Sequence, residues 1–263
     1  MPPISRIKNY LRRLRPEDSG QFQGSRDSKS AKPTAFIHLP KTGAAALSSY
    51  LRKKLNVTNA LIISSRRELA FMRDDELAQH DFFVVHTNAM ILRRLPECHK
   101  ITLLRDPLAR VLACYITSRN DPRDTVMARQ ARQLSLFEFV SSDHPTISAA
   151  IENVQVKRLI LDLSHAEQAQ SQLLSRLSSE ELIDRARDSL DQLDAVGRLE
   201  NMKIMLKQLR DLYALDTTED FQFPNANVQD VDTDSVDKRV KRVIRQRTKL
   251  DQLLYEEVRA RFG

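Results

Sequence analysis

The chain has 263 residues, of which 41% are hydrophobic and 29% are charged, so it is long enough for one globular domain with a buried core. Its low aromatic content and its two cysteines, which lack metal-ligand spacing, exclude a disulfide-stabilised scaffold and favour a reducing compartment such as the cytoplasm. No apolar run is long enough to span a bilayer, and the basic N-terminus lacks the apolar core of a secretory signal.

The first part of the chain differs from the rest in charge. Residues 1–33 hold eight basic and three acidic side chains. They therefore carry most of the chain's net charge of +7, and the remaining residues together are close to neutral. Within this first part, residues 4–15 place apolar side chains at helical spacing among Arg and Lys. Two interpretations stay open: a basic helix that contacts an anionic membrane or an acidic partner, or a solvated tail. We expect a basic arm at 1–33 and a folded domain at 34–263.

From residue 34 onward, short apolar runs alternate with stretches of helical periodicity. We expect strands at 34–38, 59–64, 81–86 and 100–104, with a further short strand around 194–197. We expect helices near 44–55, 66–78, 106–119, 123–141, 146–163, 166–176, 179–192, 199–213 and 236–262. This alternation predicts an α/β fold: a P-loop-like parallel sheet flanked by helices, followed by a helical C-terminal half. Ligands of such sheets bind at the carboxyl ends of the strands.

The sequence Pro-Lys-Thr-Gly at residues 40–43 follows the first expected strand and precedes a helix. Free backbone N–H groups at a helix N-terminus, the helix dipole and the charge of Lys41 together predict an anion site. The order of residues differs from a Walker A loop, because Lys41 precedes Gly43 and no hydroxyl follows to hold magnesium. A P-loop NTPase is therefore disfavoured.

Two segments together resemble the sulfotransferases that use 3′-phosphoadenosine-5′-phosphosulfate (PAPS), in particular the heparan sulfate 2-O-sulfotransferase-like group and its bacterial relatives. The turn at 40–43 is similar to the family's 5′-phosphosulfate loop, Pro-Lys-Thr-Gly-Gly-Thr-Ser-Leu. The segment ITLLRDPLARVLACY, residues 101–115, is similar to the family's Arg-Asp-Pro-x-x-Arg-x-x-Ser-x-Tyr element, which holds the 3′-phosphate. Arg105 and Lys41 both stand at the carboxyl end of an expected strand, so both should reach the same edge of a parallel sheet.

Further segments resemble the family in the same order along residues 34–262. DFFVVH followed by Thr87 and Asn88 is similar to the family's strand ending in Gly-His, and NVQVKRLI is similar to its Asn-x-Gln-x-Arg helix. DAVGRLENM resembles its Val-Gly-Leu-x-Glu segment, and KLDQLLYEEVRARF resembles its closing helix.

The resemblance implies transfer of a sulfuryl group from PAPS to an acceptor, which by analogy is a small molecule or a saccharide, without a metal. Lys41 would stabilise the leaving phosphate, and His86 would act as general base. The family pattern places nucleotide contacts at Lys41, Thr42, Gly43, Ala44, Ala45, Ala46, Arg105 and Ala113. The alternative for His86 is a buried, hydrogen-bonded histidine that closes its strand, and His38 is expected to be a packed group.

The chain departs from the family where hydroxyl groups contact phosphate. Ala44, Ala45 and Ala46 replace Gly-Thr-Ser, and Ala113 replaces the serine of the 3′-phosphate element. Each lost hydroxyl is worth about 1.5–3 kcal/mol toward a charged oxygen. Two hypotheses follow: an enzyme with weak or compensated nucleotide binding, or a catalytically lapsed sulfotransferase fold that serves as a nucleotide-binding or protein-interaction module. Binding of nucleic acid is disfavoured, since the sequence has no recognition motif.

The sequence leaves two possible roles open for several polar residues. Asn153 and Gln155 could face the cleft or cap neighbouring elements, and Glu200 could be a cap or an ion-pair partner. A basic cluster near the C-terminus could reach an anionic ligand, but a solvated helix face is the favoured reading. That cluster comprises Lys238, Arg239, Lys241, Arg242 and Arg245.

Overall fold

The computed structural model describes residues 32–65, 69–160, 177–218, 221–223 and 232–263. Lys32–Gly263 forms one compact unit. The basic arm expected at 1–33 lies almost entirely outside the described residues, as does the helix expected at 166–176, so both stay predictions.

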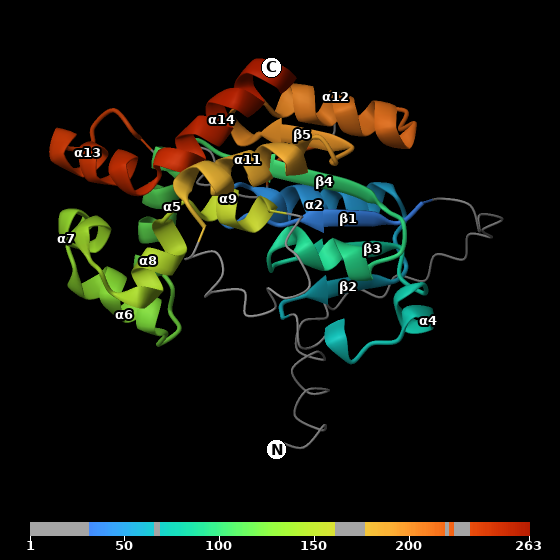
Figure 1. Cartoon of the computed structure of the whole chain (residues 1–263), viewed down its shortest axis with the longest axis horizontal. Coiled ribbons are helices and arrows are strands. Elements are labelled where there is room, and N and C mark those ends of the chain that lie inside the picture. The colour runs from blue at the N-terminus through green and yellow to red at the C-terminus, as the bar shows by residue number, and fades with distance from the viewer. Residues whose placement is uncertain (1–31, 66–68, 161–176, 219–220, 224–231) are drawn as a thin grey trace. The chain divides into compact units, whose positions relative to one another are not determined.

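A five-stranded sheet forms the centre of the described unit (Figure 1). Its strands are β1 (Thr34–Ile37), β2 (Ala60–Ile63), β3 (Phe82–Val85), β4 (His99–Leu104) and β5 (Ala195–Arg198). They lie in the order β2-β3-β1-β4-β5, and every neighbouring pair is parallel. The predicted α/β class and all five predicted strands are confirmed. The strand β1 lies in the middle, so the turn after it is flanked by the ends of both β3 and β4.

Helices connect the strands and make up most of the chain after β4. Two short 3₁₀ helices, η1 (Ala89–Arg94) and η3 (Leu199–Asn201), lie beside the sheet. The α-helices are α2 (Ala44–Lys54), α4 (Asp74–Leu77), α5 (Pro107–Arg119), α6 (Val126–Gln133), α7 (Leu136–Ser141), α8 (Pro145–Ile151), α9 (Val154–Leu159), α11 (Ser179–Leu190), α12 (Met202–Tyr213), α13 (Lys238–Arg247) and α14 (Lys249–Phe262).

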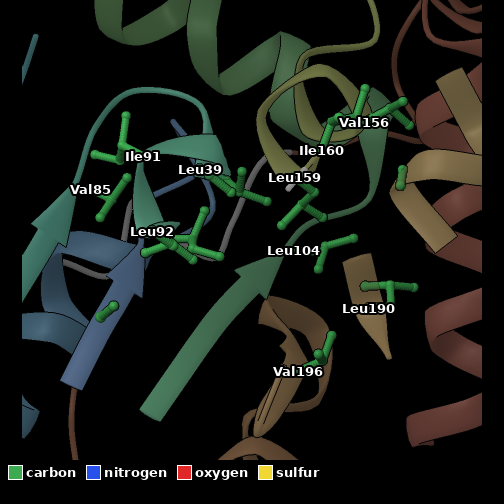
Figure 2. Packing of buried hydrophobic residues seen from close by; sticks show 14 of the residues in the cluster. Leu39, Val85, Ile91, Leu92, Leu104, Val156, Leu159, Ile160, Leu190 and Val196 are labelled. Atoms are coloured by element: carbon green, nitrogen blue, oxygen red, sulfur yellow. The ribbon is translucent and has the colours of Figure 1, made fainter. Parts of the chain in front are cut away.

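Both faces of the sheet are covered, as predicted for parallel strands. On one face, Phe36 and Phe82 pack in a core with residues of α2 and α12, including Leu47 and Leu209. On the other face, strand residues such as Val85 pack with side chains of α9, α11 and α14. Figure 2 shows part of this second core, in which Leu39 and Leu104 lie near Leu159 of α9 and near Ile160, which follows that helix.

A third core lies among the helices that follow β4. Val111 of α5 packs there with Phe139 of α7, Ile147 of α8 and Ile244 of α13. In Figure 1, α5 leads from the end of β4 toward α6, α7 and α8. The helix α5 therefore joins the sheet edge to a separate helical region.

Two of the expected helices differ because capping residues interrupt them. In place of one helix over 66–78, the described part of that segment contains the short helix α4, and three acidic residues in its first turn favour a start at Asp74. The helix expected over 123–141 is divided into α6 and α7, since Ser135 and Glu138 form a capping box at the start of α7.

The other breaks have local causes as well. The helix expected over 146–163 is divided at Asn153, which has a left-handed φ of 45° and separates α8 from α9. The helix expected over 236–262 is divided at Thr248, whose hydroxyl donates to the Ile244 carbonyl and so caps the end of α13. The helix expected over 199–213 begins as the 3₁₀ helix η3.

Both cysteines, Cys98 and Cys114, are buried and form no disulfide. Within the parts of the chain that the structure describes, no helix is both long and apolar enough to cross a membrane.

Candidate functional site

The turn after β1 has an unusual backbone. Leu39 is fully buried and fixes the start of the turn in the core, and the buried Thr42 hydroxyl donates to the Leu39 carbonyl at 2.9 Å. Lys41 and Gly43 both have left-handed φ angles, of 67° and 79°, with Thr42 between them. Successive residues of alternating hand turn their N–H groups toward one side and form an anion-binding concavity.

The backbone amides of this turn lack a hydrogen-bond acceptor in the described part of the chain. Among the described residues, none accepts a hydrogen bond from the backbone N–H groups of residues 41–45. Gly43 is the N-cap of α2 and supplies no side-chain cap, and the first turn of α2 contains no acidic residue. Unsatisfied N–H groups and the positive end of the helix dipole therefore converge at residues 41–45, as the sequence predicts for an anion site.

The loop residues that the sequence predicts as nucleotide contacts differ in their exposure and in their hydrogen bonds. The Thr42 hydroxyl is engaged inside the loop, so it closes the turn and leaves its amide free. Lys41 is exposed and forms no ion pair with a described carboxylate. Ala44 is buried, whereas Ala45 is exposed. A Cβ at Gly43 would lie 2.8 Å from Leu199 Cδ1, so a larger residue would displace the Leu199 side chain and would be strained at this positive φ.

Arg105 lies at the carboxyl end of β4 and reaches the same turn. Its Nη1 donates to the Lys41 carbonyl at 3.1 Å, so the two predicted positions are in direct contact. The residue is 2% exposed, and its buried Nε has no hydrogen-bond partner. Burial lowers the pKa of Arg105, and the negative charges of Glu200 and Asp106 oppose that effect. Its guanidinium group forms no ion pair with any described carboxylate.

Residues of helix α9 form hydrogen bonds with the segments that follow β3 and β4. Gln155, which is fully buried, accepts from the Arg105 amide at 3.0 Å and donates to the Arg105 carbonyl at 2.9 Å. Arg158, one turn later on α9, donates to the carbonyl of His86. The side-chain amide of Asn88 donates to the carbonyl of Lys157. The backbones that carry Arg105 and His86 are therefore held by a single short helix.

His86 follows β3, as predicted, and lies beside His38, with ring centroids 4.2 Å apart. Burial and then the charge of Arg158 lower the pKa of His86. Burial, followed by the positive charges of His86, Arg158 and Lys41, lowers the pKa of His38 to about 3. His38 Nδ1 is buried without a hydrogen-bond partner. Both rings are therefore neutral near pH 7, and a neutral imidazole can accept a proton.

Arg158 is the residue at this edge that the sequence analysis does not identify. Burial and then the charge of Arg110 lower its pKa. Arg158 lies three residues after Gln155, so both side chains lie on one face of α9. This spacing is the feature of the sequence from which Arg158 could have been identified.

Asn153 and Glu200, for which the sequence left two roles open, form hydrogen bonds within the fold. Asn153 Oδ1 accepts from the amides of Leu250 and Asp251 and so caps α14. Glu200 accepts from the Asp106 amide at 2.9 Å and from the Tyr255 hydroxyl at 3.0 Å. The basic cluster lies on α13, whose buried residues Val240 and Ile244 pack in the helical core.

A cavity of about 860 Å³ is lined by Arg105 and by residues at the start of α5, at the end of β5, in η3 and in α14, together with Thr233. It is lined by Arg105 and Ala109, but not by Lys41 or by Ala113. Ala113 is buried on α5, one turn beyond Ala109. Within the described ranges, no group of three or more His, Cys, Asp or Glu side chains is arranged to hold a metal ion.

No protein-family model matches this chain, and a comparison with curated proteins finds no match either.

Proposed function

We propose that this protein is a sulfotransferase that moves a sulfuryl group from PAPS to a hydroxyl acceptor, which by analogy with the resembling group is a saccharide. The observation that carries the proposal is the row of unpartnered amides at residues 41–45, with Lys41 on the loop and the Arg105 guanidinium closing on it. The backbone donors of this loop do not depend on the hydroxyl groups that Ala44–Ala46 lack. They fit an anion that approaches the N-terminus of α2.

The donor nucleotide supplies a sulfuryl group on a good leaving phosphate. In the transfer, the acceptor oxygen forms a bond to sulfur while the bond between sulfur and the phosphate oxygen breaks. Lys41 and the loop amides would stabilise the charge that develops on the phosphate. His86, neutral because of its lowered pKa, would take the proton from the acceptor hydroxyl. Arg158 would keep the His86 backbone in place through its carbonyl.

A second candidate is a lapsed fold that serves as a nucleotide-binding or protein-interaction module. It is favoured by the alanines at 44–46 and by Leu199 and Phe223, which pack close over Gly43. An enzyme and a nucleotide-binding module would both bind the nucleotide, but only the enzyme would transfer the sulfuryl group. A protein-interaction module would do neither.

Binding of 3′,5′-phosphoadenosine separates these readings. Calorimetric titration should show binding, and either Lys41→Ala or Arg105→Ala should weaken it by about tenfold or more, since each removes a charged contact. Arg105→Lys controls for loss of the buried cation, and thermal unfolding without ligand checks that each variant folds. Unchanged affinity in both alanine variants would reject the site.

A gain-of-function variant tests the role of the missing hydroxyls. Ala45→Thr with Ala46→Ser restores the residues found in the resembling family and should strengthen nucleotide binding by about tenfold or more. Turnover is then measured with labelled PAPS in the original chain and in His86→Ala. The enzyme hypothesis requires that His86→Ala retains binding and loses turnover. If neither the original chain nor the restored loop binds the nucleotide at millimolar concentration, the protein-interaction module is the better reading.

A further inference from the structure

The cavity beside Arg105 is large enough for part of a nucleotide and borders the anion loop. Its volume of about 860 Å³ lies in the range of small-molecule sites. Two of its lining residues also contact the loop. Arg105 Nη1 bonds the Lys41 carbonyl, and Leu199 lies against Gly43. A ligand that extends past Arg105 and Leu199 would therefore have one end at the loop and the other in the cavity.

Most of the charged groups around the cavity already have partners. Asp106 accepts from the Ala109 amide, and Glu200 accepts from the Asp106 amide and from Tyr255. Arg198 donates to the Tyr255 hydroxyl and to the Gly263 carbonyl. These contacts hold α5, β5 and α14 together, so these three side chains form the fixed wall of the cavity.

Two cations in the wall retain donors for a ligand. Arg105 is 2% exposed and has a buried Nε without a partner. Arg259 of α14 has a side chain that is 63% exposed, and among the described residues its one carboxylate partner is Glu256, at 3.4 Å. Glu256 also lines the cavity, so Arg259 would have to leave this carboxylate to bind a phosphate. An exposed pair at this distance contributes little, so Arg259 can turn toward an anion at small cost.

We propose that the cavity binds the 3′-phosphate end of the nucleotide, and that Arg259 is the second cation, beside Arg105, that holds this phosphate. The inference rests on the proposed function and extends it to a residue outside the family pattern. Two guanidinium groups can each direct paired N–H donors to one phosphate.

The test compares two nucleotides that differ only in the 3′-phosphate. Titration with 3′,5′-phosphoadenosine and with 5′-AMP is performed on the original chain, on Arg259→Gln and on Arg261→Gln. Arg261 is the matched control, because it lies on the same helix and pairs with Asp191 and Glu257 away from the cavity lining. Thermal unfolding without ligand verifies that both variants are folded.

We expect the original chain to bind the doubly phosphorylated nucleotide more tightly than 5′-AMP. Arg259→Gln should reduce that preference by about tenfold and leave the affinity for 5′-AMP unchanged, whereas Arg261→Gln should change neither. If both nucleotides bind through Lys41 but Arg259→Gln keeps the full preference, this inference is wrong and the proposed function stands. If the original chain binds neither nucleotide, both fail.

Discussion

The buried and partly buried arginines of the helical region and those at the sheet edge differ in what their guanidinium groups bind. In the helical region, Arg247 donates to the carbonyls of Val140 and Ser142, to the Ser148 hydroxyl and to the Glu152 carboxylate. Arg110 is fully buried, donates to the carbonyls of Ala150 and Ile151, and lies 4.0 Å from the Asp251 carboxylate.

At the sheet edge, the arginine side chains have no carboxylate partner among the described residues. Arg105 and Arg158 each donate to one backbone carbonyl, and neither forms an ion pair with a described carboxylate. A buried cation without a counterion is costly, and folds retain few of them without a reason. Arg110 and Arg247 bind groups of the fold itself. The contrast supports the proposal that the cations at the sheet edge bind an anion from outside the chain.

The largest expected effect is on stability in the helical region. Arg110→Met should lower the free energy of unfolding by about 3–5 kcal/mol, because it leaves Asp251 buried without its counterion. Chemical denaturation measures this loss. Arg239→Met is the control, since Arg239 forms an exposed pair with Asp237 and should cost less than about 1 kcal/mol. Equal, small losses in both variants would contradict a structural role for Arg110.

The next effect is a dependence of stability on pH that arises at the sheet edge. The folded chain keeps His38 neutral down to about pH 3, whereas the unfolded chain protonates it near the ordinary pKa of 6.5. The stability from His38 is therefore complete above pH 6.5 and is lost on acidification, by about 2 kcal/mol at pH 5.

Denaturation of the original chain and of His38→Gln at pH 7 and pH 5 tests this. The variant should lose about 2 kcal/mol less between the two pH values than the original chain does. His80→Gln is the control, because the His80 ring meets the Glu76 carbonyl outside the cationic edge. The same loss in all three proteins would show that His38 is not held neutral by its surroundings.

The smallest effect concerns the backbone of the anion loop. Lys41 and Ala214 both occupy left-handed conformations, with φ angles of 67° and 48°. Replacing either by glycine should raise the free energy of unfolding by about 1 kcal/mol, because glycine adopts this conformation without steric cost. Only Lys41→Gly should also weaken the binding of 3′,5′-phosphoadenosine. Equal nucleotide affinity in the two variants would remove Lys41 from the site.

The sequence predicted the elements of the site that depend on local chemistry. Apolar runs of four to six residues became strands, and the turn at residues 40–43 became a loop with free amides at a helix start. The sequence did not predict Arg158, nor that Gln155 would bind the Arg105 backbone, because a periodic helix does not reveal which strand end its polar face meets. It also did not predict the cavity, whose lining comes from four separate segments of the chain.

By itself, the sequence determined the alternation of strands and helices and the places where charge stands at a strand end, since hydrophobic periodicity and turn chemistry act over a few residues. Only the tertiary structure decided which of those charges would be neutralised. That choice depends on contacts between distant segments: α14 brings Asp251 to Arg110, and no described segment brings a carboxylate into an ion pair with Lys41, Arg105 or Arg158. Pairing of buried charge is set by packing, and packing is a property of the whole fold.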